Sequence, residues 1–553
     1  MPCTSIIPSV ISHMYAMGVR HIVVSSGSRS FPIVSAVVRS GLFSITTILD
    51  ERSAAFFAIG ISRTTGGEPV ALICTSGSAV LNYGPAVAEA FYSHLPLLVI
   101  SADRPADRLN QNEPQTIDQT GVLSNITCAS ESFKADYDDI HTLEAAQKRL
   151  ADIFGSLLPP RSQPVHINIH IPEPLCVPDS SPLTAFFSQT VESVFSSEAI
   201  GVEELAEDYA RLKRVMVFVG PGYFRKSLYD ILCQLNNLPN TVILTEPSSG
   251  YPTFISGFDA LKKGLSKEIC PQLLISIGGA PTSRAFKQYI KENNVPNWHI
   301  AHSDADIDGF RTLRRMIKSE PSHFLSKLYR CLQCKDIVSD YSKRMRCLSR
   351  HIHKRVKSYD FDWSDIGALQ KILPYLANVN LQCSNGMLIR YYDMLNIMPD
   401  FMPKSFGCNR GVSGIDGSTS TALGSASVSL VPTVLLTGDL SAQYDICALF
   451  ATELPVGFRM IVFCNNGGDI FRIIEATRTL PEREKYLSMS GLMPEQWENI
   501  AKAAKMEYYS ARNYNELASC LNGMFANDAP SLLTINTSGT DNLTILNNFT
   551  KTI

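Results

Sequence analysis

Short apolar runs recur along the chain, and stretches in which apolar residues keep a helical spacing separate them. This alternation predicts parallel sheets flanked by helices. A first block of expected strands consists of His21–Ser25, Ser44–Leu49, Pro69–Thr75, Pro96–Ser101 and Val165–Ile169. A second block consists of Val215–Gly220, Thr241–Thr245, Leu273–Ile277 and Trp298–His302. A third block consists of Val379–Cys383, Thr433–Thr437, Met460–Cys464 and Ser531–Ile535.

Two stretches of different composition separate these blocks. The Pro- and Ser-rich stretch Pro172–Ser197 is expected to be a linker, and the basic stretch Pro321–Tyr359 is expected to be a helical connector. A chain of 553 residues is too long for one hydrophobic core. We therefore expect three α/β domains, at residues 1–180, 198–340 and 355–553.

Composition and charge narrow the possible classes of function. Apolar residues make up 45% of the chain and charged residues 18%, as in an ordinary soluble globular enzyme. The net charge of −3 gives no reason to expect nucleic acid or an anionic membrane as a partner. The stretch from Met1 to Arg20 lacks the basic start and apolar core of a leader, and no apolar run reaches membrane-spanning length. A cytoplasmic protein is therefore expected.

The 14 cysteines are scattered, several of them in apolar runs, as is typical of reduced thiols. One group raises the possibility of a zinc site. This group is a basic, helical segment that contains Cys331, Cys334, Cys347, His351 and His353. It has no second C-x-x-C pair, so we assign no metal to it.

The stretch V-L-L-T-G-D-L-S-A-Q-Y-D at 434–445 and the later I-V-F-C-N-N-G-G at 461–468 carry the strongest chemical signal. Each is an apolar run that ends in oxygen-bearing side chains and glycines. A short helix is expected between them at Ile446 to Thr452, which makes the whole a right-handed βαβ unit. The carboxylate of Asp439 and the amide oxygen of the Asn at 465 or 466 would then converge outside the sheet's carboxyl edge.

Carboxylate, amide and backbone carbonyl oxygens suit Mg²⁺, which usually shares its ligands with phosphate oxygens. The spacing resembles the diphosphate-and-metal motif of thiamine diphosphate enzymes, with Leu440 in place of the usual glycine. The alternative is an ordinary βαβ unit with a Gly-Asp turn and a polar loop.

Glu51 stands at the carboxyl end of an expected strand and opens an apolar helix, D-E-R-S-A-A-F-F-A-I-G at 50–60. A carboxyl group in such a place is partly desolvated. Thiamine chemistry needs such a carboxyl against the aminopyrimidine ring of the cofactor. The alternative is that Glu51 is a first-turn acid that interacts with the helix dipole.

Other strand ends carry small polar residues and arginines. The runs S-S-G-S-R-S at 25–30 and T-S-G-S-A-V at 75–80 offer backbone N–H groups as anion sites, and N-E-P-Q-T-I-D-Q at 112–119 adds amides. Arginine recognises carboxylates bidentately. The strand ends and loops carry four arginines, Arg29, Arg104, Arg390 and Arg410. Any one of them could be an ordinary surface residue. Together they indicate a substrate with more than one carboxylate.

A longer set of motifs follows in order between residues 26 and 471. They are S-G-S-R-S, D-E-R, T-S-G-S-A-V, A-D-R-P, Q-x-I-D-Q, V-H-I-N-x-x-x-x-E-P-L, N-R-G-x-S-G-I-D-G, G-D-L-S-x-x-Y-D and N-G-G-x-I-F. By these runs the chain resembles the family of 2-succinyl-5-enolpyruvyl-6-hydroxy-3-cyclohexene-1-carboxylate synthases, the thiamine diphosphate enzymes of menaquinone biosynthesis. The resemblance covers the first and third blocks well and the middle block thinly.

The resemblance implies three doubly wound parallel-sheet domains: a pyrimidine-binding domain, a central domain and a diphosphate- and Mg-binding domain. It implies a transferase, a carboligase that decarboxylates 2-oxoglutarate and adds the succinyl-semialdehyde unit to isochorismate. The cofactors would be thiamine diphosphate and Mg²⁺ or Mn²⁺. A homodimer or homotetramer is implied, with the active sites at the subunit interface.

Carried over by position, the resemblance also implies roles for individual residues. The catalytic residues would be Glu51, Arg390 and Arg410. Substrate would contact Ser28, Arg29, Arg104, Gln115, Arg284, Gly386, Arg390 and Arg410. The cofactor would contact Glu51, Thr75, Ser76, Gly386, Ile415, Gly438, Asp439, Leu440, Ser441, Asn465, Gly467, Ile470 and Phe471. The metal ligands would be Asp439, Asn465 and the carbonyl of Gly467, with Asn466 and Gly468 as the alternatives one residue on.

Three positions depart from the family pattern. Gly386 stands where a serine is common, Cys464 replaces a polar residue, and Ser26 replaces a proline. None of these removes a group that the chemistry needs. The competing hypotheses are another thiamine diphosphate-dependent 2-oxo acid decarboxylase or carboligase, a silent paralogue that binds the cofactor without turnover, and an unrelated nucleotide-binding α/β protein.

Overall fold

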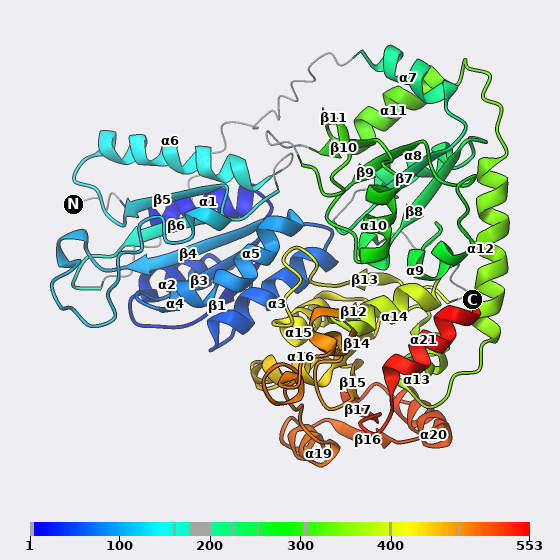
Figure 1. Ribbon diagram of the computed structural model, residues 1–553. Coiled ribbons are helices and arrows are strands. Elements are labelled where there is room, and N and C mark those ends of the chain that lie inside the picture. The colour runs from blue at the N-terminus through cyan, green and yellow to red at the C-terminus, as the bar shows by residue number, and fades with distance from the viewer. Residues whose placement is uncertain are drawn as a thin grey trace. The chain divides into compact units, whose positions relative to one another are not determined.

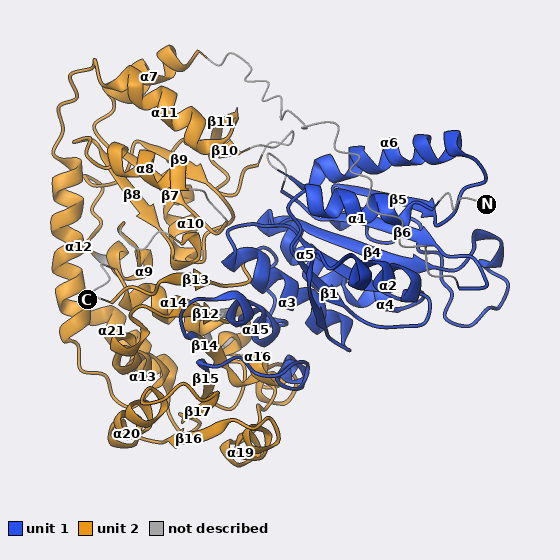
Figure 2. Ribbon diagram, turned by 180° about the vertical axis from the view of Figure 1, so that it is seen from behind, with its two compact units in different colours: residues 1–194, 411–433, 444–458 blue, residues 195–410, 434–443, 459–553 orange. Residues whose placement is uncertain are grey.

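The chain forms three β-sheets and two compact units. The computed structural model describes residues 5–158, 162–175, 201–222, 226–250, 254–301, 307–397, 401–473 and 475–553 (Figure 1). The first unit comprises residues 1–194, 411–433 and 444–458 and holds the first sheet (Figure 2). The second unit comprises residues 195–410, 434–443 and 459–553 and holds the other two sheets.

The first sheet is parallel, and its central strands are fully buried. Its strand order is β2 (Ser44–Thr47), β1 (His21–Val24), β3 (Val70–Cys74), β4 (Leu97–Asp103), β6 (Val165–His170) and β5 (Ala129–Lys134). The apolar runs of β3 and β4 are typical of parallel strands that helices cover on both faces. The larger helices around this sheet are α1 (Ile7–Ala16), α2 (Phe31–Ser40), α3 (Glu51–Thr64), α5 (Gly84–Ser93) and α6 (Ile140–Leu157).

Helix α3 is buried along most of its length because it packs against the first sheet and against α15 (Ser418–Val428). The two helices approach closely at two glycines. A Cβ at Gly60 would collide with the carbonyl oxygen of Thr421, and a Cβ at Gly424 would collide with that of Phe57. Only glycine leaves room for this backbone contact.

The second sheet is also parallel. Its strand order is β11 (Leu313–Lys318), β10 (Asn297–Ala301), β9 (Leu273–Ile277), β7 (Val215–Val219) and β8 (Thr241–Thr245). The helices around it include α7 (Val202–Arg211), α8 (Lys226–Leu235), α9 (Phe258–Leu261), α10 (Arg284–Glu292), α11 (Pro321–Leu332) and α12 (Tyr341–Ser358).

The third sheet carries the strongest chemical motifs. Its strand order is β13 (Ser405–Gly407), β12 (Asn380–Cys383), β14 (Thr433–Gly438), β15 (Phe458–Cys464), β17 (Ser531–Asn536) and β16 (Glu507–Ala511). Its helices include α13 (Asp365–Ile372), α14 (Met387–Leu395), α16 (Asp439–Tyr444), α17 (Ile470–Ile473), α19 (Pro494–Ala503), α20 (Tyr514–Met524) and α21 (Asn542–Thr552).

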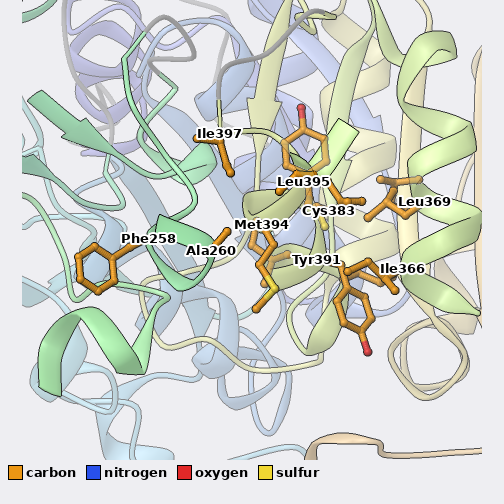
Figure 3. Packing of buried hydrophobic residues seen from close by; sticks show 14 of the residues in the cluster. Phe258, Ala260, Ile366, Leu369, Cys383, Tyr391, Met394, Leu395 and Ile397 are labelled. Atoms are coloured by element: carbon orange, nitrogen blue, oxygen red, sulfur yellow. The ribbon is translucent and has the colours of Figure 1, made fainter. Parts of the chain in front are cut away.

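One continuous apolar core joins the second and third sheets within the second unit. Figure 3 shows part of it, where Ala260 of α9 lies near Met394 of α14. The core also includes Phe218 of β7 and residues of β14 and β15. The two sheets of this unit therefore share buried apolar area.

The predicted fold class, parallel-sheet α/β with helices between the strands, is confirmed. Each strand expected from the sequence is present close to its expected bounds. Four further strands, β5, β11, β13 and β16, were not expected, and all four lie at sheet edges. Edge strands are half-exposed and therefore lack the apolar runs of central strands.

Some connections also differ from the expectation. The stretch expected as a short helix at Ile446 to Thr452 is a 3₁₀ helix at Ile446–Phe450, preceded by α16. Helix α11, expected as part of a connector, contributes Phe324, Leu325, Leu328 and Leu332 to the core around the second sheet. Residues 176–197 of the expected linker and residue 302 lie outside the described residues. The boundaries of the three expected domains stay a prediction.

Among the described residues, no helix combines the length and apolar character needed to cross a membrane.

Candidate active site

The ends of strands β14 and β15 bring Asp439 and the Asn-Asn-Gly-Gly turn together. The two strands are neighbours in the sheet, and Asp439 follows the end of β14. The Asp439 carboxylate accepts hydrogen bonds from the backbone N–H of Leu440 (2.8 Å) and of Gly467 (3.1 Å). Asp439 is 2% exposed. The structure therefore brings the Asp439 carboxylate to the turn at Gly467, and its convergence with the amide oxygen of an Asn at 465 or 466 stays a prediction.

Asn465 and Asn466 differ sharply in their surroundings. The Asn465 side chain donates from Nδ2 to Asp365 (2.8 Å) and to Asp469 (3.2 Å). Its Oδ1 is buried and accepts no hydrogen bond from any described residue. Asn466 is exposed and has a positive φ of 65°. A buried amide oxygen without a donor is what a cation ligand needs, and only Asn465 provides it.

The electrostatics around this point also favour a cation. Burial raises the pKa of Asp439 to about 6, and the charge of Asp469 adds to this shift. Burial raises the pKa of Asp365 to about 7, and the charges of Asp469 and Asp439 add to it. A divalent cation beside these carboxylates would offset the repulsion between them.

The described residues contain no group of three or more His, Cys, Asp and Glu side chains arranged to hold one metal ion. This statement covers Cys331, Cys334, Cys347, His351 and His353, of which Cys334, Cys347 and His351 are exposed. A cation at Asp439 would therefore depend on amide and backbone oxygens as well as on one carboxylate. Such an all-oxygen set suits Mg²⁺ or Mn²⁺.

A second segment packs against the Gly467–Gly468 turn. The N–H of Gly468 donates to the carbonyl oxygen of Ser488 (2.7 Å), and a Cβ at Gly467 would collide with the carbonyl oxygen of Met489. A Cβ at Gly491 would strike the Asp439 carboxylate. Only glycine tolerates these approaches, and Ile470 and Phe471 follow in α17, half-buried.

The backbone conformation at residue 386 accounts for one departure from the family pattern, a glycine where a serine is common. Gly386 precedes α14 with φ 109° and ψ −139°, a conformation that L-residues rarely adopt. A serine here would be strained even though a Cβ would meet open space. Near it, the N–H of Gly438 donates to Ser384 (3.3 Å), while Leu440 is half-buried and Ser441 buried.

Three arginines of the second unit, in α10, in α14 and after β13, lie close enough to affect one another. Burial lowers the pKa of Arg390, and the positive charges of Arg410 and Arg284 lower it further. Arg390 also donates to the carbonyl oxygen of Gly386, and Arg410 donates to the amide oxygen of Asn385 (3.1 Å). Such a concentration of positive charge favours an anionic ligand.

Two carboxylates that the sequence motifs did not indicate, the buried Glu246 and the half-buried Asp259, act electrostatically on Arg390. Glu246 follows β8, is 4% exposed, and accepts hydrogen bonds from the backbone N–H of Thr282 (2.7 Å and 2.8 Å) and of Ser283 (3.1 Å). It thereby secures the segment that leads into α10 and its first residue, Arg284.

In the first unit, Glu51 is the first residue of α3. Asp50 caps this helix, because its side chain accepts from the N–H groups of Arg52 and Ser53. The Glu51 carboxylate accepts a hydrogen bond from the Asn82 side chain (3.1 Å) and is half-buried. Burial, and then the charge of Glu51, raises the pKa of the Cys74 thiol at the end of β3.

The predicted anion-binding turns lie side by side. A Cβ at Gly27 would overlap the side chain of Thr75, the first residue after β3. Ser76, which follows Thr75, is buried, whereas Ser28 is exposed.

The loop with Gln115 and Gln119 lies over the turn at Gly77. Gln119 is fully buried and accepts a hydrogen bond from the N–H of Gly77 (2.8 Å). A Cβ at Gly77 would come within 3.2 Å of Gln115 Cα. Gln119 donates to Asn168 (2.8 Å), which in turn donates to Asp103 (2.8 Å).

Arg29 and Arg104 converge on one carboxylate. Arg29 donates to Glu173 Oε1 (2.5 Å), and Arg104 donates to the same oxygen (3.2 Å). Arg29 is 5% exposed, whereas the Glu173 side chain is 57% exposed. The hydrogen bond from Arg29, and then the charges of Arg29 and Arg104, lower the pKa of Glu173. The pair is thus spaced to hold a carboxylate at the surface of the first unit.

Glu89 holds the loop that carries Ile415. Its two carboxylate oxygens accept hydrogen bonds from the N–H groups of Gly411 (2.8 Å) and Val412 (2.7 Å). Glu89 is 2% exposed, and Ile415 is 43% exposed. An apolar side chain displayed on a secured loop is available to a ligand.

The expected site residues therefore fall into two sets, each described within its own unit. The first set contains Ser28, Arg29, Glu51, Thr75, Ser76, Arg104, Gln115 and Ile415. The second contains Arg284, Gly386, Arg390, Arg410, Gly438, Asp439, Leu440, Ser441, Asn465, Gly467, Ile470 and Phe471.

Comparisons with known proteins agree with this chemistry. Residues 8–122 match the family described as "Thiamine pyrophosphate enzyme, N-terminal TPP binding domain". A 2-succinyl-5-enolpyruvyl-6-hydroxy-3-cyclohexene-1-carboxylate synthase of Flavobacterium johnsoniae is 34% identical, over 100% of this chain and 99% of the relative. Synthases with the same name from Porphyromonas gingivalis (32% identical, over 98% of this chain and 96% of the relative) and Cytophaga hutchinsonii (30%, over 98% and 97%) are also similar.

Proposed function

Because the chain belongs to the family of 2-succinyl-5-enolpyruvyl-6-hydroxy-3-cyclohexene-1-carboxylate synthases, we propose that the two sets of site residues together serve one thiamine diphosphate. The chain is a thiamine diphosphate-dependent transferase of menaquinone biosynthesis. It decarboxylates 2-oxoglutarate and adds the succinyl-semialdehyde unit to isochorismate, with release of CO₂.

We propose that Asp439, Asn465 and the carbonyl of Gly467 hold a Mg²⁺ or Mn²⁺ ion that binds the diphosphate. The support is the buried Asn465 Oδ1 without a hydrogen-bond donor among the described residues, in the turn whose Gly467 N–H donates to the buried Asp439 carboxylate (3.1 Å). Gly438, Leu440 and Ser441 would line the diphosphate. The bound cofactor supplies the carbanion chemistry that amino-acid side chains lack.

Glu51 would exchange a proton with the aminopyrimidine ring nitrogen of the cofactor. Its position at the start of a buried helix keeps the carboxyl in place, and Asn82 orients one of its oxygens (3.1 Å). Thr75 and Ser76, with Gly77 secured by Gln119, would bound the same end of the cofactor. Ile415 would support its bent shape from the loop that Glu89 holds.

The arginines would bind the substrate carboxylates. Both 2-oxoglutarate and isochorismate carry two carboxylates, and each unit of this chain presents arginines together. Arg29 and Arg104 already share the Glu173 carboxylate, and a substrate carboxylate could replace it. In the first unit, Ser28 and Gln115 would add polar contacts to this pair. In the second unit, the second cationic group consists of Arg284, Arg390 and Arg410.

One cofactor would need residues of both units, and these residues could come from two different chains. We propose a homodimer or homotetramer with the active sites at subunit interfaces, as the family resemblance implies, in the cytoplasm. Gel filtration with light scattering in the presence of thiamine diphosphate and Mg²⁺ tests this assembly, and a monomer would contradict it.

The observation that carries the proposal for the metal site most directly is the buried amide oxygen of Asn465, which accepts no hydrogen bond within the described part of the chain. The function is tested by incubating the purified protein with Mg²⁺, thiamine diphosphate, 2-oxoglutarate and isochorismate. Mass spectrometry should identify 2-succinyl-5-enolpyruvyl-6-hydroxy-3-cyclohexene-1-carboxylate. Product from pyruvate at an equal rate, with isochorismate left unchanged, would instead indicate another 2-oxo acid carboligase.

A further inference from the structure

The Asn465 side chain makes hydrogen bonds on one side only. Both hydrogens of its amide nitrogen are used, one by Asp365 (2.8 Å) and one by Asp469 (3.2 Å). The amide oxygen faces the other way and accepts no hydrogen bond from the described residues. A side-chain amide can bind a cation only through its oxygen, so the orientation of this group decides whether the site works.

Other contacts fix the two carboxylates that hold the amide. Asp365 is 1% exposed, and its second oxygen accepts from the Thr537 hydroxyl (2.5 Å). Its backbone N–H donates to Asn542 (2.9 Å). Asp469 accepts from Arg472 (2.6 Å) and from Asn542 (3.3 Å). These groups come from helices α13 and α21, from the residue after β17 and from the turn before α17.

Rotation of the amide by half a turn would reverse its polarity. The oxygen would then face Asp365 and Asp469, two acceptors, and both hydrogen bonds would be lost. The NH₂ group would take the place that the oxygen now holds, where it would repel a cation. The two carboxylates therefore allow only the orientation that presents oxygen to the site.

We propose that Asp365, assisted by Asp469, is a positioning residue that orients the amide of Asn465 so that Oδ1 is presented to the divalent cation. This inference rests on the proposed metal site and adds to it a function for residues outside the set of ligands. Asp365 is not among the proposed ligands of the cation. Its effect reaches the cation through Asn465.

A double-mutant cycle on the full-length protein tests this. The variants are Asp365→Leu, which has a similar size but no acceptor, Asn465→Ala, and the combination of both. The readout is binding of Mn²⁺ in the presence of thiamine diphosphate, followed by the electron paramagnetic resonance signal of unbound Mn²⁺. This measurement does not depend on turnover.

We expect Asp365→Leu to weaken Mn²⁺ binding ~10–100-fold when Asn465 is present, the usual cost of losing an outer partner of a metal ligand. In the Asn465→Ala background the same substitution should change the affinity by less than about twofold, because there is no amide to orient. Asp365→Asn should retain most of the affinity, since its amide oxygen can accept from Asn465 while its NH₂ donates to Thr537. The matched control is Asp308→Asn. The Asp308 carboxylate also accepts hydrogen bonds, from the backbone N–H groups of Thr312 and Leu313, but makes no hydrogen bond with Asn465.

An equal loss in both backgrounds would show a merely structural function of Asp365 and would overturn the inference, as would unchanged affinity in Asp365→Leu. If Asp365→Leu does not fold, Asp469→Leu takes its place in the same cycle, because Asp469 uses the other hydrogen of the same amide. Asp439→Ala distinguishes a failure of the proposed metal site from a failure of the positioning function. Undiminished Mn²⁺ binding in Asp439→Ala would overturn the metal site itself, whereas loss of binding there with an additive cycle overturns the positioning function alone.

Discussion

At the scale of single residues, the chemistry of this chain depends on carboxylates and an amide in contrasting environments. Glu51 is half-buried at a helix start, whereas Asp439 and Asp365 are buried among other acids. Burial raises the pKa of Asp365 to about 7. The negative charges of the acids at the proposed metal site therefore repel one another until a cation binds. Glu51 instead accepts a hydrogen bond from the amide of Asn82.

Glu51→Gln should leave the fold and cofactor binding intact but lower turnover by at least ~100-fold, because an amide cannot transfer the proton that general acid–base catalysis requires. The measurement is hydrogen–deuterium exchange at C2 of bound thiamine diphosphate, alongside steady-state rates. A thermal shift on adding cofactor serves as the control for binding. Exchange at the wild-type rate would contradict the assignment of Glu51.

Asp439→Ala should abolish the thermal stabilisation that thiamine diphosphate and Mg²⁺ give together. In the wild type this stabilisation follows mass action, about 2.7 kcal/mol at a ligand concentration of 100 Kd. Asn465→Ala should lose most of the effect, whereas its neighbour Asn466→Ala is a matched control that should keep it, since Asn466 is exposed. A larger loss in Asn466→Ala would reassign the ligand by one residue.

At the scale of elements, the strand ends are what organise the site. β14 and β15 deliver Asp439 and Asn465 to one point, and β3 and β4 deliver the Thr75 turn and Arg104. Strands β4 and β6 of the first sheet carry a buried polar network, in which Ser101 Oγ is 2.8 Å from His166 Nε2 and donates to Asn168 (2.8 Å). The network continues through Gln119 to the turn at Gly77.

His166 should make the protein sensitive to acid. Burial lowers the pKa of this fully buried imidazole from 6.5 to about 4. Between these values the unfolded chain binds more protons than the folded one, so the free energy of unfolding falls as the pH drops from about 6.5 towards 4. The loss amounts to at most about 3 kcal/mol. Denaturant titrations at pH 7 and pH 5 should therefore differ more for the wild type than for His166→Gln, and equal differences would contradict this.

Sequence reasoning recovered the central strands and the motif residues, for a physical reason. Central parallel strands are buried on both faces and have apolar runs, as in β3. The edge strand β11, Leu-Arg-Arg-Met-Ile-Lys, has one buried residue, Ile317, and has no such run. Asp439 and Asn465 were predictable because they directly follow apolar strands.

The supporting acids were not predictable in the same way. Asp365 is 100 residues from Asn465 in sequence, and Glu89 is 322 residues from Gly411. Glu246 contacts Thr282 from 36 residues away. No local pattern marks such partners, because only the tertiary fold brings them to the groups that they hold.

At the scale of the whole molecule, arginines in both units point to two dicarboxylate substrates. Arg29 and Arg104 form one group, and Arg284, Arg390 and Arg410 form another. A simple decarboxylase of a monocarboxylic 2-oxo acid would not need both. The selectivity of this chain for its donor and its acceptor should therefore divide among these arginines.

Replacing arginines one at a time by alanine should separate the two half-reactions. Loss of one charge-assisted contact costs ~1.5–3 kcal/mol, roughly ten- to a hundredfold. Some of the variants should impair addition to isochorismate while sparing decarboxylation of 2-oxoglutarate with an artificial electron acceptor. Arg211→Ala, an exposed arginine of α7, is the matched control. If every variant affected both half-reactions equally, the arginines would not discriminate between donor and acceptor.

The close glycine contact between α3 and α15 has a consequence for how the chain comes apart. Helix α15 belongs to the first unit, but the chain leaves it directly into β14, a strand of the third sheet. Separating α3 from α15 would expose the buried face of each helix and release the backbone that leads into that strand. A fragment ending after β6 would carry α3 with this face uncovered, a surface prone to aggregation. The first unit should consequently fold only when residues 418–428 are present, although the chain reaches them after residues 195–410 of the other unit.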